Sequence, residues 1–336
     1  MIAGDRGGIG GPSVSGFTLR PITASDLDEL LELIRTSRRT DGVERSIGDA
    51  QLRHAFDDPR IDLERDSRLV VDRIGRTVAF VAAIPRQEAS REARAFVLGE
   101  VHPDSRGQGV GSTLVRWARD RAVEVLRERS PGVPIALYAD APIDALDRIR
   151  LLEHAGFVTV RYFTDMERTL DDDIEQRTLP GGLRSAGWDD GSAGAVRDAH
   201  NAAFLDHWNF QPWDAQSWSH NIADAPGLLR GATSIAIAGD TVAGYVIVFD
   251  STDSHPDGRQ SGELAIIGVR REYRGQGLAS ALITRSLEAL AGAGYVRAEL
   301  DVDAANSTGA VGLYERLGFR PVRRSVLLQH SPVPEE

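Results

Sequence analysis

The chain has 336 residues, with 39 Lys+Arg against 50 Asp+Glu and a net charge of −11 at pH 7. Every one of those cations is an arginine, because the sequence contains no lysine, and it also contains no cysteine. These absences exclude disulfides, a cysteine nucleophile, a phosphate-loop lysine and a lysine Schiff base, and we expect no metal site. The acidic balance argues against general binding to nucleic acid or to an anionic membrane.

Residues 1–16 come first in chain order and carry six glycines but no apolar stretch. This composition predicts a disordered tail and not a signal peptide. No apolar run further along the chain approaches the roughly 20 residues of a membrane span. We therefore expect a cytoplasmic protein with no nucleic-acid or membrane partner, as a monomer or a homodimer.

A first domain is predicted over residues 17–170. Its apolar stripe from Leu27 to Ile34 indicates a helix, for which Ser25 is the expected N-cap. The other predicted elements are a strand over 17–23, a helix over 47–56, strands over 69–72, 77–84 and 95–101, a helix through Arg127, a strand over 135–138, a helix through His154 and two closing strands. The strand over 77–84 is almost continuously apolar, which is typical of a strand buried on both faces.

The second half of the chain repeats this order. Arg106 and Arg274 each begin an Arg-Gly-Gln-Gly loop, and the 168 residues between them are half the chain. A charged stretch followed by Pro and Gly, residues 171–182, is typical of a linker. We therefore predict a second domain over residues 183–330, with its last strand over 325–329. The predicted fold class is α+β, a mixed α/β sandwich built from two tandem domains.

Both glycine loops lie between an apolar strand and an amphipathic helix. Glycines allow several backbone N–H groups to point into one concavity, and the start of the helix adds the positive end of its dipole. Such a site suits a diphosphate. The phosphate-loop and dinucleotide-binding fingerprints are excluded, because neither spacing is present. The alternative is a tight turn in which glycine only relieves crowding, and the second copy of the loop favours a phosphate-bearing ligand.

The second loop, the strand before it, Asn306, Tyr314 and the Gly318-Phe319 pair together resemble the acetyl-CoA-binding signature of the GCN5-related N-acetyltransferase (GNAT) superfamily. The resemblance implies two GNAT-type domains, each a mostly antiparallel twisted sheet with a splayed central strand pair and flanking helices. It also implies an acyltransferase that uses acetyl-CoA and releases CoA. The cofactor-binding residues that it implies are Ile267, Gly268, Val269, Arg274, Gly275, Gln276, Gly277, Leu278, Ala279, Ser280 and Asn306, with Gly99, Glu100, Val101, Arg106, Gly107, Gln108, Gly109, Val110, Gly111 and Ser112 as first-half counterparts.

Transfer of an acetyl group to an amine requires a neutral amine and an acid that protonates the leaving thiolate. Glu263 lies near the strand that in this family abuts the thioester, and we expect it to act as the base. Tyr314 lies on the helix that in this family approaches the sulfur, and we expect it to act as the acid. The first-half counterparts are Ala95 and Leu152, and Glu100 stands five residues further along its strand. The C-terminal domain is therefore expected to be the catalytic one.

The acceptor is expected to be a primary amine of a small molecule. An aromatic stretch over residues 200–218 is the expected wall of its cleft, because the acceptor of this family usually lies over that segment. The proposed substrate-binding residues are Asp206, His207, Trp208, Phe210 and Trp213, whereas Trp218 and His220 are expected to pack in the core. The tandem layout is similar to that of the mycothiol synthases, which acetylate a cysteinyl pseudodisaccharide. A non-catalytic acetyl-CoA sensor, and transfer of longer acyl groups, remain as alternatives.

Overall fold

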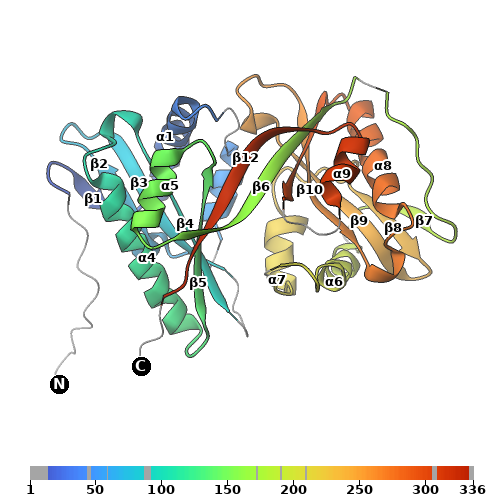
Figure 1. The fold of residues 1–336 in the computed structure, drawn as a ribbon, viewed down its shortest axis with the longest axis horizontal. Coiled ribbons are helices and arrows are strands. Elements are labelled where there is room, and N and C mark those ends of the chain that lie inside the picture. The colour runs from blue at the N-terminus through green and yellow to red at the C-terminus, as the bar shows by residue number, and fades with distance from the viewer. Residues whose placement is uncertain are drawn as a thin grey trace. The chain divides into compact units, whose positions relative to one another are not determined.

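The computed structural model describes residues 14–43, 47–58, 60–86, 92–171, 173–189, 191–208, 210–304 and 309–332. The chain divides into two compact units (Figure 1). Unit 1 consists of Met1–Val160 together with Val326–Glu336, and unit 2 consists of Arg161–Ser325. Residues 161–170, which we expected in the first domain, therefore belong to unit 2, and residues 326–330 belong to unit 1.

Unit 1 contains a mostly antiparallel sheet with helices packed on it. Its strands are, in spatial order, β1 (Thr18–Arg20), β2 (Ser67–Val71), β3 (Thr77–Pro85), β4 (Ala93–Val101) and β5 (Ile135–Pro142). Its helices are η1 (Ala24–Asp26), α1 (Leu27–Thr40), α2 (Asp49–Phe56), α3 (Leu63–Asp66), η2 (Pro103–Ser105), α4 (Val110–Arg129) and α5 (Leu146–His154). Neighbouring strands are antiparallel except β4 and β5, which are parallel.

Unit 2 repeats this arrangement. Its strands are, in spatial order, β7 (Arg184–Gly187), β8 (Ser234–Ala238), β9 (Thr241–Asp250), β10 (Ser261–Val269), β11 (Arg297–Asp303) and most of β6 (Val158–Thr169). Its helices are α6 (Ala193–Ala203), α7 (Ala215–Trp218), η3 (Ser219–Ala223), η4 (Thr252–Ser254), η5 (Arg271–Tyr273), α8 (Leu278–Gly292) and α9 (Ala310–Arg316). Here β10 and β11 are the parallel pair. The repeated α+β architecture confirms the predicted fold class.

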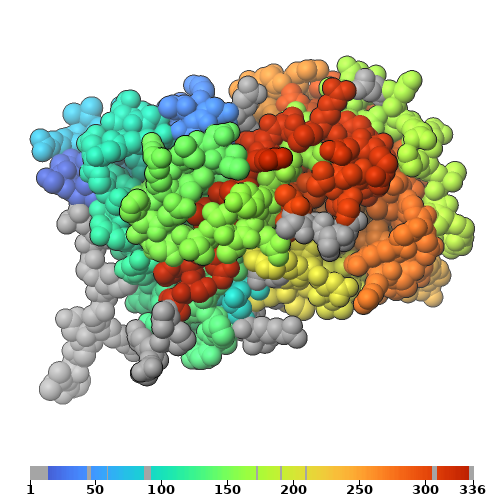
Figure 2. Space-filling model, viewed as in Figure 1, coloured from blue at the N-terminus to red at the C-terminus, as the bar shows by residue number. Residues whose placement is uncertain are grey.

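The strand that closes each unit comes from the other half of the sequence. In unit 2, β6 pairs antiparallel with β11 from Phe163 to Thr169, and Met166 is fully buried in the core of that unit. In unit 1, the end of β12 (Arg320–His330) contributes Val326 and Leu328 to the core. Figure 2 shows this C-terminal segment, in red, among the green segments of unit 1. The two halves have therefore exchanged their last strands.

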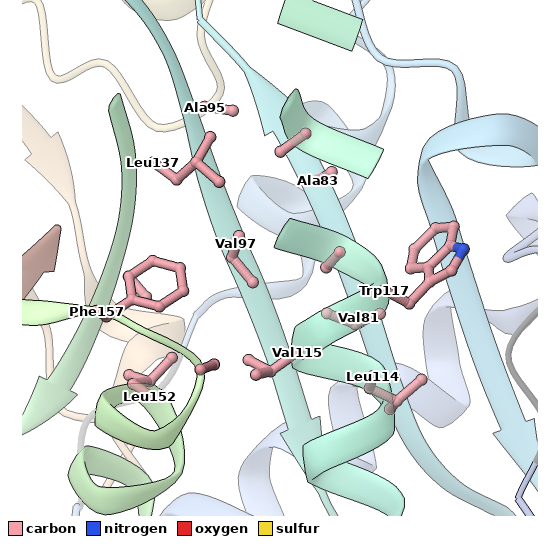
Figure 3. Close-up of a cluster of buried hydrophobic side chains, with 14 of the residues drawn as sticks. Val81, Ala83, Ala95, Val97, Leu114, Val115, Trp117, Leu137, Leu152 and Phe157 are labelled. Carbon is pink, nitrogen blue, oxygen red and sulfur yellow. The ribbon is translucent and has the colours of Figure 1, made fainter. Parts of the chain in front are cut away.

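The main core of unit 1 lies between the sheet and α4. Figure 3 shows Val81 and Val97 of the sheet facing Leu114 and Val115 of α4. The opposite face of the sheet packs on α1, where Leu30 and Ile34 are among the buried side chains. Because both faces are covered, nearly every residue of β3 is buried. The apolar run that predicted this strand is thereby explained.

Two local predictions differ from the structure. Ser25 does not cap the first helix. Instead, the side chain of Asp26 accepts a hydrogen bond from the backbone N–H of Thr23 at 2.7 Å, as part of a capping box. The two closing strands predicted for the first half are one long strand, β6.

Within the described part of the chain, no helix has the length and apolarity that crossing a bilayer requires.

Candidate functional site

The central feature of unit 2 is an opening between two parallel strands. β10 and β11 pair only from Ser261 to Glu263 on β10, although β10 continues to Val269. On its other side β10 stays paired with β9 as far as Val269, with an irregularity between Leu264 and Ile266. The edge of β10 that faces β11 therefore has no partner in that strand beyond Glu263. Backbone groups on that edge, other than the Val269 carbonyl oxygen, which accepts a hydrogen bond from Arg274, can pair with a ligand that enters the opening.

The glycine loop lies directly after this strand. Gly275 and Gly277 have φ of 73° and 83°, and Gly277 is the N-cap of α8. A Cβ atom would meet no atom within 4 Å at either position, so the left-handed backbone, and not crowding, requires glycine there. Gly107 and Gly109 of unit 1 have the same conformation, with φ of 74° and 81°. Both loops thus leave open space at the start of a long helix, as a bound anion requires.

The arginine of the loop holds the surrounding elements in place. The Nε of Arg274 donates to the carbonyl oxygen of Val269 at 3.1 Å, and its Nη2 donates to the carbonyl oxygen of Ala203 at the end of α6. Its Nη1 lies 3.8 Å from the Asp206 carboxylate. Arg106 of unit 1 makes the same bond to the carbonyl five residues before it, at 3.3 Å. The repeated arginine therefore fastens the loop to its strand and to a helix end, and it leaves a permanent positive charge beside the loop.

Glu263 occupies the last paired position before the opening. Its neighbours across the sheet are Phe249 of β9 and Glu299 of β11, and the next strand places Glu167 beside Glu299. Leu264, one residue later, is in the core with α8, so these three glutamates lie on the opposite face of the sheet. Glu263 is half-buried there. The structure thus places the expected base at the start of the opening, in a row of carboxylates.

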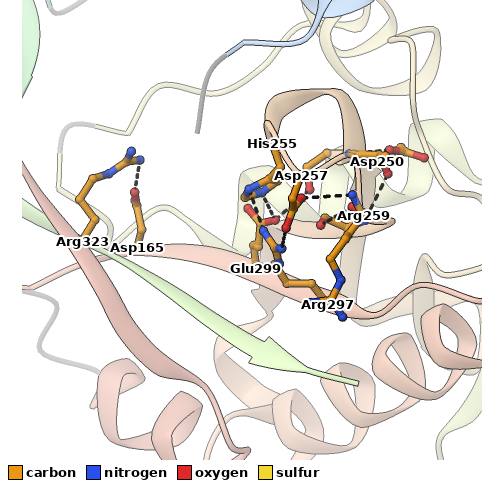
Figure 4. Close-up of polar contacts among 11 residues, drawn as sticks. Asp165, Asp250, His255, Asp257, Arg259, Arg297, Glu299 and Arg323 are labelled. Carbon is orange, nitrogen blue, oxygen red and sulfur yellow. Dashed lines mark hydrogen bonds and ion pairs between the residues drawn. The ribbon is translucent and has the colours of Figure 1, made fainter. Parts of the chain in front are cut away.

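A buried hydrogen-bond network fixes Glu299, and the sequence did not lead us to it. The Nε2 of His255 bonds the Glu299 carboxylate, and Arg297 donates to the Nδ1 of His255 at 2.7 Å (Figure 4). Because an arginine can only donate, Nδ1 is the acceptor and the proton of a neutral His255 lies on Nε2, toward Glu299. Asp257 in turn pairs with Arg297 at 2.5 Å. The only sequence signal was the alternation of acidic and apolar residues along β11.

Tyr314 lies on α9 and is buried, with 8% of its surface exposed. Burial and, to a smaller extent, the negative charge of Asp301 on β11 together raise the pKa of Tyr314 to about 12. The phenol therefore keeps its proton at neutral pH and is able to donate it. Asn306, the expected partner at the start of this helix, lies outside the described residues; the helix itself begins at Ala310.

The aromatic stretch is divided between the core and the surface. Trp218 is buried, as expected, and its ring packs on His200. Phe210 and Trp213 are half-buried and also contact the His200 ring, at centroid distances of 5.6 and 5.8 Å. Asp206, His207 and Trp208 are exposed, and the guanidinium of Arg161 lies over the Trp208 ring at 4.6 Å. The structure thus brings Phe210 and Trp213 together around His200 and leaves the other three at the surface.

Comparison with protein families places two matches on this chain. The model described as "Acetyltransferase (GNAT) family" matches residues 27–157 and 194–319. A mycothiol acetyltransferase from Salinispora arenicola is 33% identical over 235 residues, which cover 69% of this chain and 71% of that protein. A mycothiol acetyltransferase from Saccharopolyspora erythraea is 26% identical over 309 residues, which cover 86% of this chain and 96% of that protein.

Solved structures have the same fold. A GCN5-related N-acetyltransferase from Sphaerobacter thermophilus aligns with a TM-score of 0.78 at 23% identity, over 96% of this chain and 98% of that chain. A tandem GNAT protein from the clavulanic acid biosynthesis pathway aligns with a TM-score of 0.69 at 19% identity, over 95% of this chain and all of that chain. At these identities the likeness establishes the architecture.

Proposed function

Because the chain belongs to the acetyltransferase (GNAT) family and is an N-acetyltransferase, we propose that unit 2 moves the acetyl group of acetyl-CoA to a primary amine of a small molecule. The observation that carries this proposal is the opening between β10 and β11, which begins at Glu263 and ends at the glycine loop. The unpaired edge of β10, the open space at the glycine loop and the Glu263 carboxylate follow one another along this opening.

The residues along this path suit a coenzyme A thioester. The edge of β10 at Ile267, Gly268 and Val269 offers peptide groups to the amides of a pantetheine arm. The loop amides from Arg274 to Ser280, with the start of α8, offer donors to a diphosphate. When bound, acetyl-CoA would supply the activated acetyl group. The chain itself contributes binding, orientation and proton transfer.

Two side chains are proposed to move protons at opposite ends of the reaction. Glu263 takes a proton from the nitrogen of the acceptor amine, directly or through a water molecule, so that the nitrogen attacks the acetyl carbon. Tyr314 donates its phenolic proton to the sulfur that departs. The phenol is protonated when the thiolate forms, as a proton donor must be, and the assignment rests on the place of Tyr314 on α9, because a raised pKa by itself weakens an acid. In unit 1 the corresponding positions are Ala95 and Leu152, which supports catalysis by unit 2.

The acidic face of the sheet supports a cationic acceptor. Glu263, Glu299 and Glu167 lie side by side, and Asp301 of β11 pairs with Asp165 of β6 two residues further along. Glu299 is bonded to His255 and Asp165 is paired with Arg323, so the attraction for a protonated amine comes chiefly from Glu263 at the start of the opening. A cysteinyl pseudodisaccharide, the acceptor of mycothiol synthases, is the specific candidate favoured by the named relatives. For such an acceptor we retain Asp206, His207, Trp208, Phe210 and Trp213 as proposed contacts.

Conservative substitution of the two proposed proton-transfer groups tests this function. Glu263→Gln and Tyr314→Phe should each lower turnover by roughly 10²–10⁴-fold in a CoA-release assay with a panel of amines, because each removes one proton-transfer group. Acetyl-CoA affinity should stay near that of the wild type, since neither side chain lies at the loop. Glu315→Gln, an exposed neighbour of Tyr314 on α9, is the matched control.

The same experiment separates an enzyme from a sensor. A wild-type protein that binds acetyl-CoA but releases no CoA with any amine would favour the acetyl-CoA sensor. Full turnover in both variants would contradict the assignment of Glu263 and Tyr314, while leaving the family membership in place.

A further inference from the structure

Unit 1 contains its own copy of the opening between parallel strands. β4 and β5 pair only from Ala93 to Phe96 on β4, and both strands continue beyond that point. Glu100 lies on β4 past the last paired position, directly before the strand ends at Val101. In this unit the corresponding glycine loop also follows the strand. The backbone framework of a cofactor cleft is therefore present twice in the chain.

An ion pair spans the opening of unit 1. Arg148 extends from α5, and its Nη1 donates to the Glu100 carboxylate on β4 at 2.8 Å. Its Nε donates to the carbonyl oxygen of Asp140 on β5 at 3.1 Å. One guanidinium is thus bonded to both separated strands. The second oxygen of the carboxylate accepts a hydrogen bond from Ser37 of α1 at 2.9 Å.

The buried carboxylate of Glu100 depends on the positive charge of Arg148. Glu100 is buried, with 7% of its surface exposed. Burial alone would raise the pKa of Glu100, but the positive charges of Arg148 and Arg38, with the hydrogen bond from Ser37, hold it below its usual value. Removing Arg148 from the pair would leave a buried carboxylate without its main counter-charge, which is strongly unfavourable. An uncharged ligand arm that displaced the guanidinium would offer amide groups but no compensating charge.

Unit 2 has no side chains that could form this bridge at the matching positions. The residue that corresponds to Glu100 is Gly268, and the residue that corresponds to Arg148, counted from the shared Gly-Phe pair, is Ala310. A Cβ on Gly268 would lie 2.5 Å from the Tyr245 ring, so the structure requires glycine there. The opening of unit 2 therefore has Gly268 and Ala310 at the positions where Glu100 and Arg148 form the ion pair in unit 1.

From this contrast we infer that the Glu100–Arg148 ion pair closes the cleft of unit 1 to coenzyme A thioesters, so that each chain binds one, in unit 2. The inference rests on the proposed function of unit 2 and adds the stoichiometry. It also assigns Glu100 and Arg148 a role in excluding ligand, where a role in binding was expected for Glu100. The first glycine loop then serves as a turn between strand and helix.

A matched pair of loop variants tests the inference by titration calorimetry with acetyl-CoA on the full chain. Gly109→Asp and Gly277→Asp place one carboxylate at equivalent positions of the two loops. Both positions have nearly the same left-handed φ, so the two variants carry the same backbone strain, which aspartate accepts more readily than most other residues, and a Cβ meets no atom within 4 Å at either position. The added charge repels a diphosphate. We expect one site in the wild type, one site in Gly109→Asp and no site in Gly277→Asp.

The other outcomes of this titration are distinct. Two sites in the wild type, reduced to one by Gly109→Asp, would overturn the inference and leave the proposed function intact. A single site that is lost in Gly109→Asp and kept in Gly277→Asp would overturn both, because the cofactor would then bind in unit 1. A wild type that shows no binding would also overturn both.

Opening the bridge provides the converse test. The double variant Arg148→Ala with Glu100→Ala removes both charges together, so no unpaired buried charge remains. We expect a second acetyl-CoA site in this variant. The control is Arg150→Ala, which changes an exposed arginine on the same helix and should keep a single site. A folded double variant that still binds one equivalent would overturn the ion pair as the cause of closure. If the double variant does not fold, the two aspartate variants decide the stoichiometry.

Discussion

The exchange of closing strands makes a specific prediction about two buried side chains. Leu328, near the C-terminus, packs in the core of unit 1 with Leu114 of α4. Met166, from the first half of the sequence, packs in the core of unit 2 with Leu282 of α8. Leu328→Ala should therefore weaken unit 1, and Met166→Ala should weaken unit 2. Each substitution thus acts on the unit opposite to its place in the sequence.

The size of the effect follows from burial. Leu328 and Met166 are both 0% exposed, and truncating such side chains to alanine costs about 2–5 kcal/mol of the free energy of unfolding. Because about 1.4 kcal/mol corresponds to a tenfold change in an equilibrium constant, the opening equilibrium of the affected unit should rise roughly 30-fold to several thousand-fold. Val322→Ala is the control on β12, since Val322 is 53% exposed, and it should change stability by less than about 0.5 kcal/mol.

Native-state hydrogen exchange read by mass spectrometry measures each unit separately. Leu328→Ala should accelerate exchange in peptides from α4 and leave those from α8 close to the wild-type rate. Met166→Ala should do the reverse. The reasoning would be refuted if Leu328→Ala accelerated exchange in α8 while α4 stayed protected, because β12 would then close the half of the chain from which it comes.

Two further predictions concern the packing beside the opening of unit 2. Burial lowers the pKa of His200 to about 4. Between pH 6.5 and 4 the imidazole is therefore protonated in the unfolded chain and neutral in the folded chain. Up to about 3 kcal/mol of the free energy of unfolding is lost as the pH falls through that window. In urea titrations at pH 7 and 4.5, His200→Gln should reduce this acid loss; an unchanged loss would contradict it. Gly268→Ala should destabilise the chain by about 1–3 kcal/mol, because its Cβ would meet the Tyr245 ring. Gly187→Ala, on a strand with open space, should leave the melting temperature nearly unchanged, and equal shifts would contradict the argument.

The sequence was most informative where one residue type has one physical reason to be present. The left-handed turns of both loops need glycine, and so Gly277 and Gly109 indicated the strand, loop and helix around them. The continuous apolar run of β3 indicated burial on both faces. Glu263 could be placed in the strand before the loop because it lies eleven residues before Arg274 in the sequence.

The exchanged strands could not be predicted in this way. β6 and β12 each follow a Gly-Phe pair, and in each strand buried and half-buried residues alternate only in its later part. A strand sequence specifies which face is buried, but not which of two similar sheets it joins. The choice is made by contacts such as that of Met166 with the core of unit 2, which lie far from the strand in the sequence.

The polar bridges were missed for a related reason. Arg148 near the start of a helix is typical of a solvent-exposed residue, and its partner Glu100 is 48 residues away. His255 and Glu299 are separated by 44 residues. Pairs of this kind depend on how far two strands diverge, and no local pattern encodes that separation.

The exchanged strands also determine when each unit can be completed during synthesis on the ribosome. Unit 1 has its first 160 residues early, but Val326 and Leu328 are translated only after all of unit 2. Until they emerge from the exit tunnel, the nascent chain exposes the unpaired edge of β5 and an unfilled patch beside α4. Unit 2 has received β6 long before its own strands are made. The second half can therefore finish first, in contrast to the usual N-to-C order of co-translational folding.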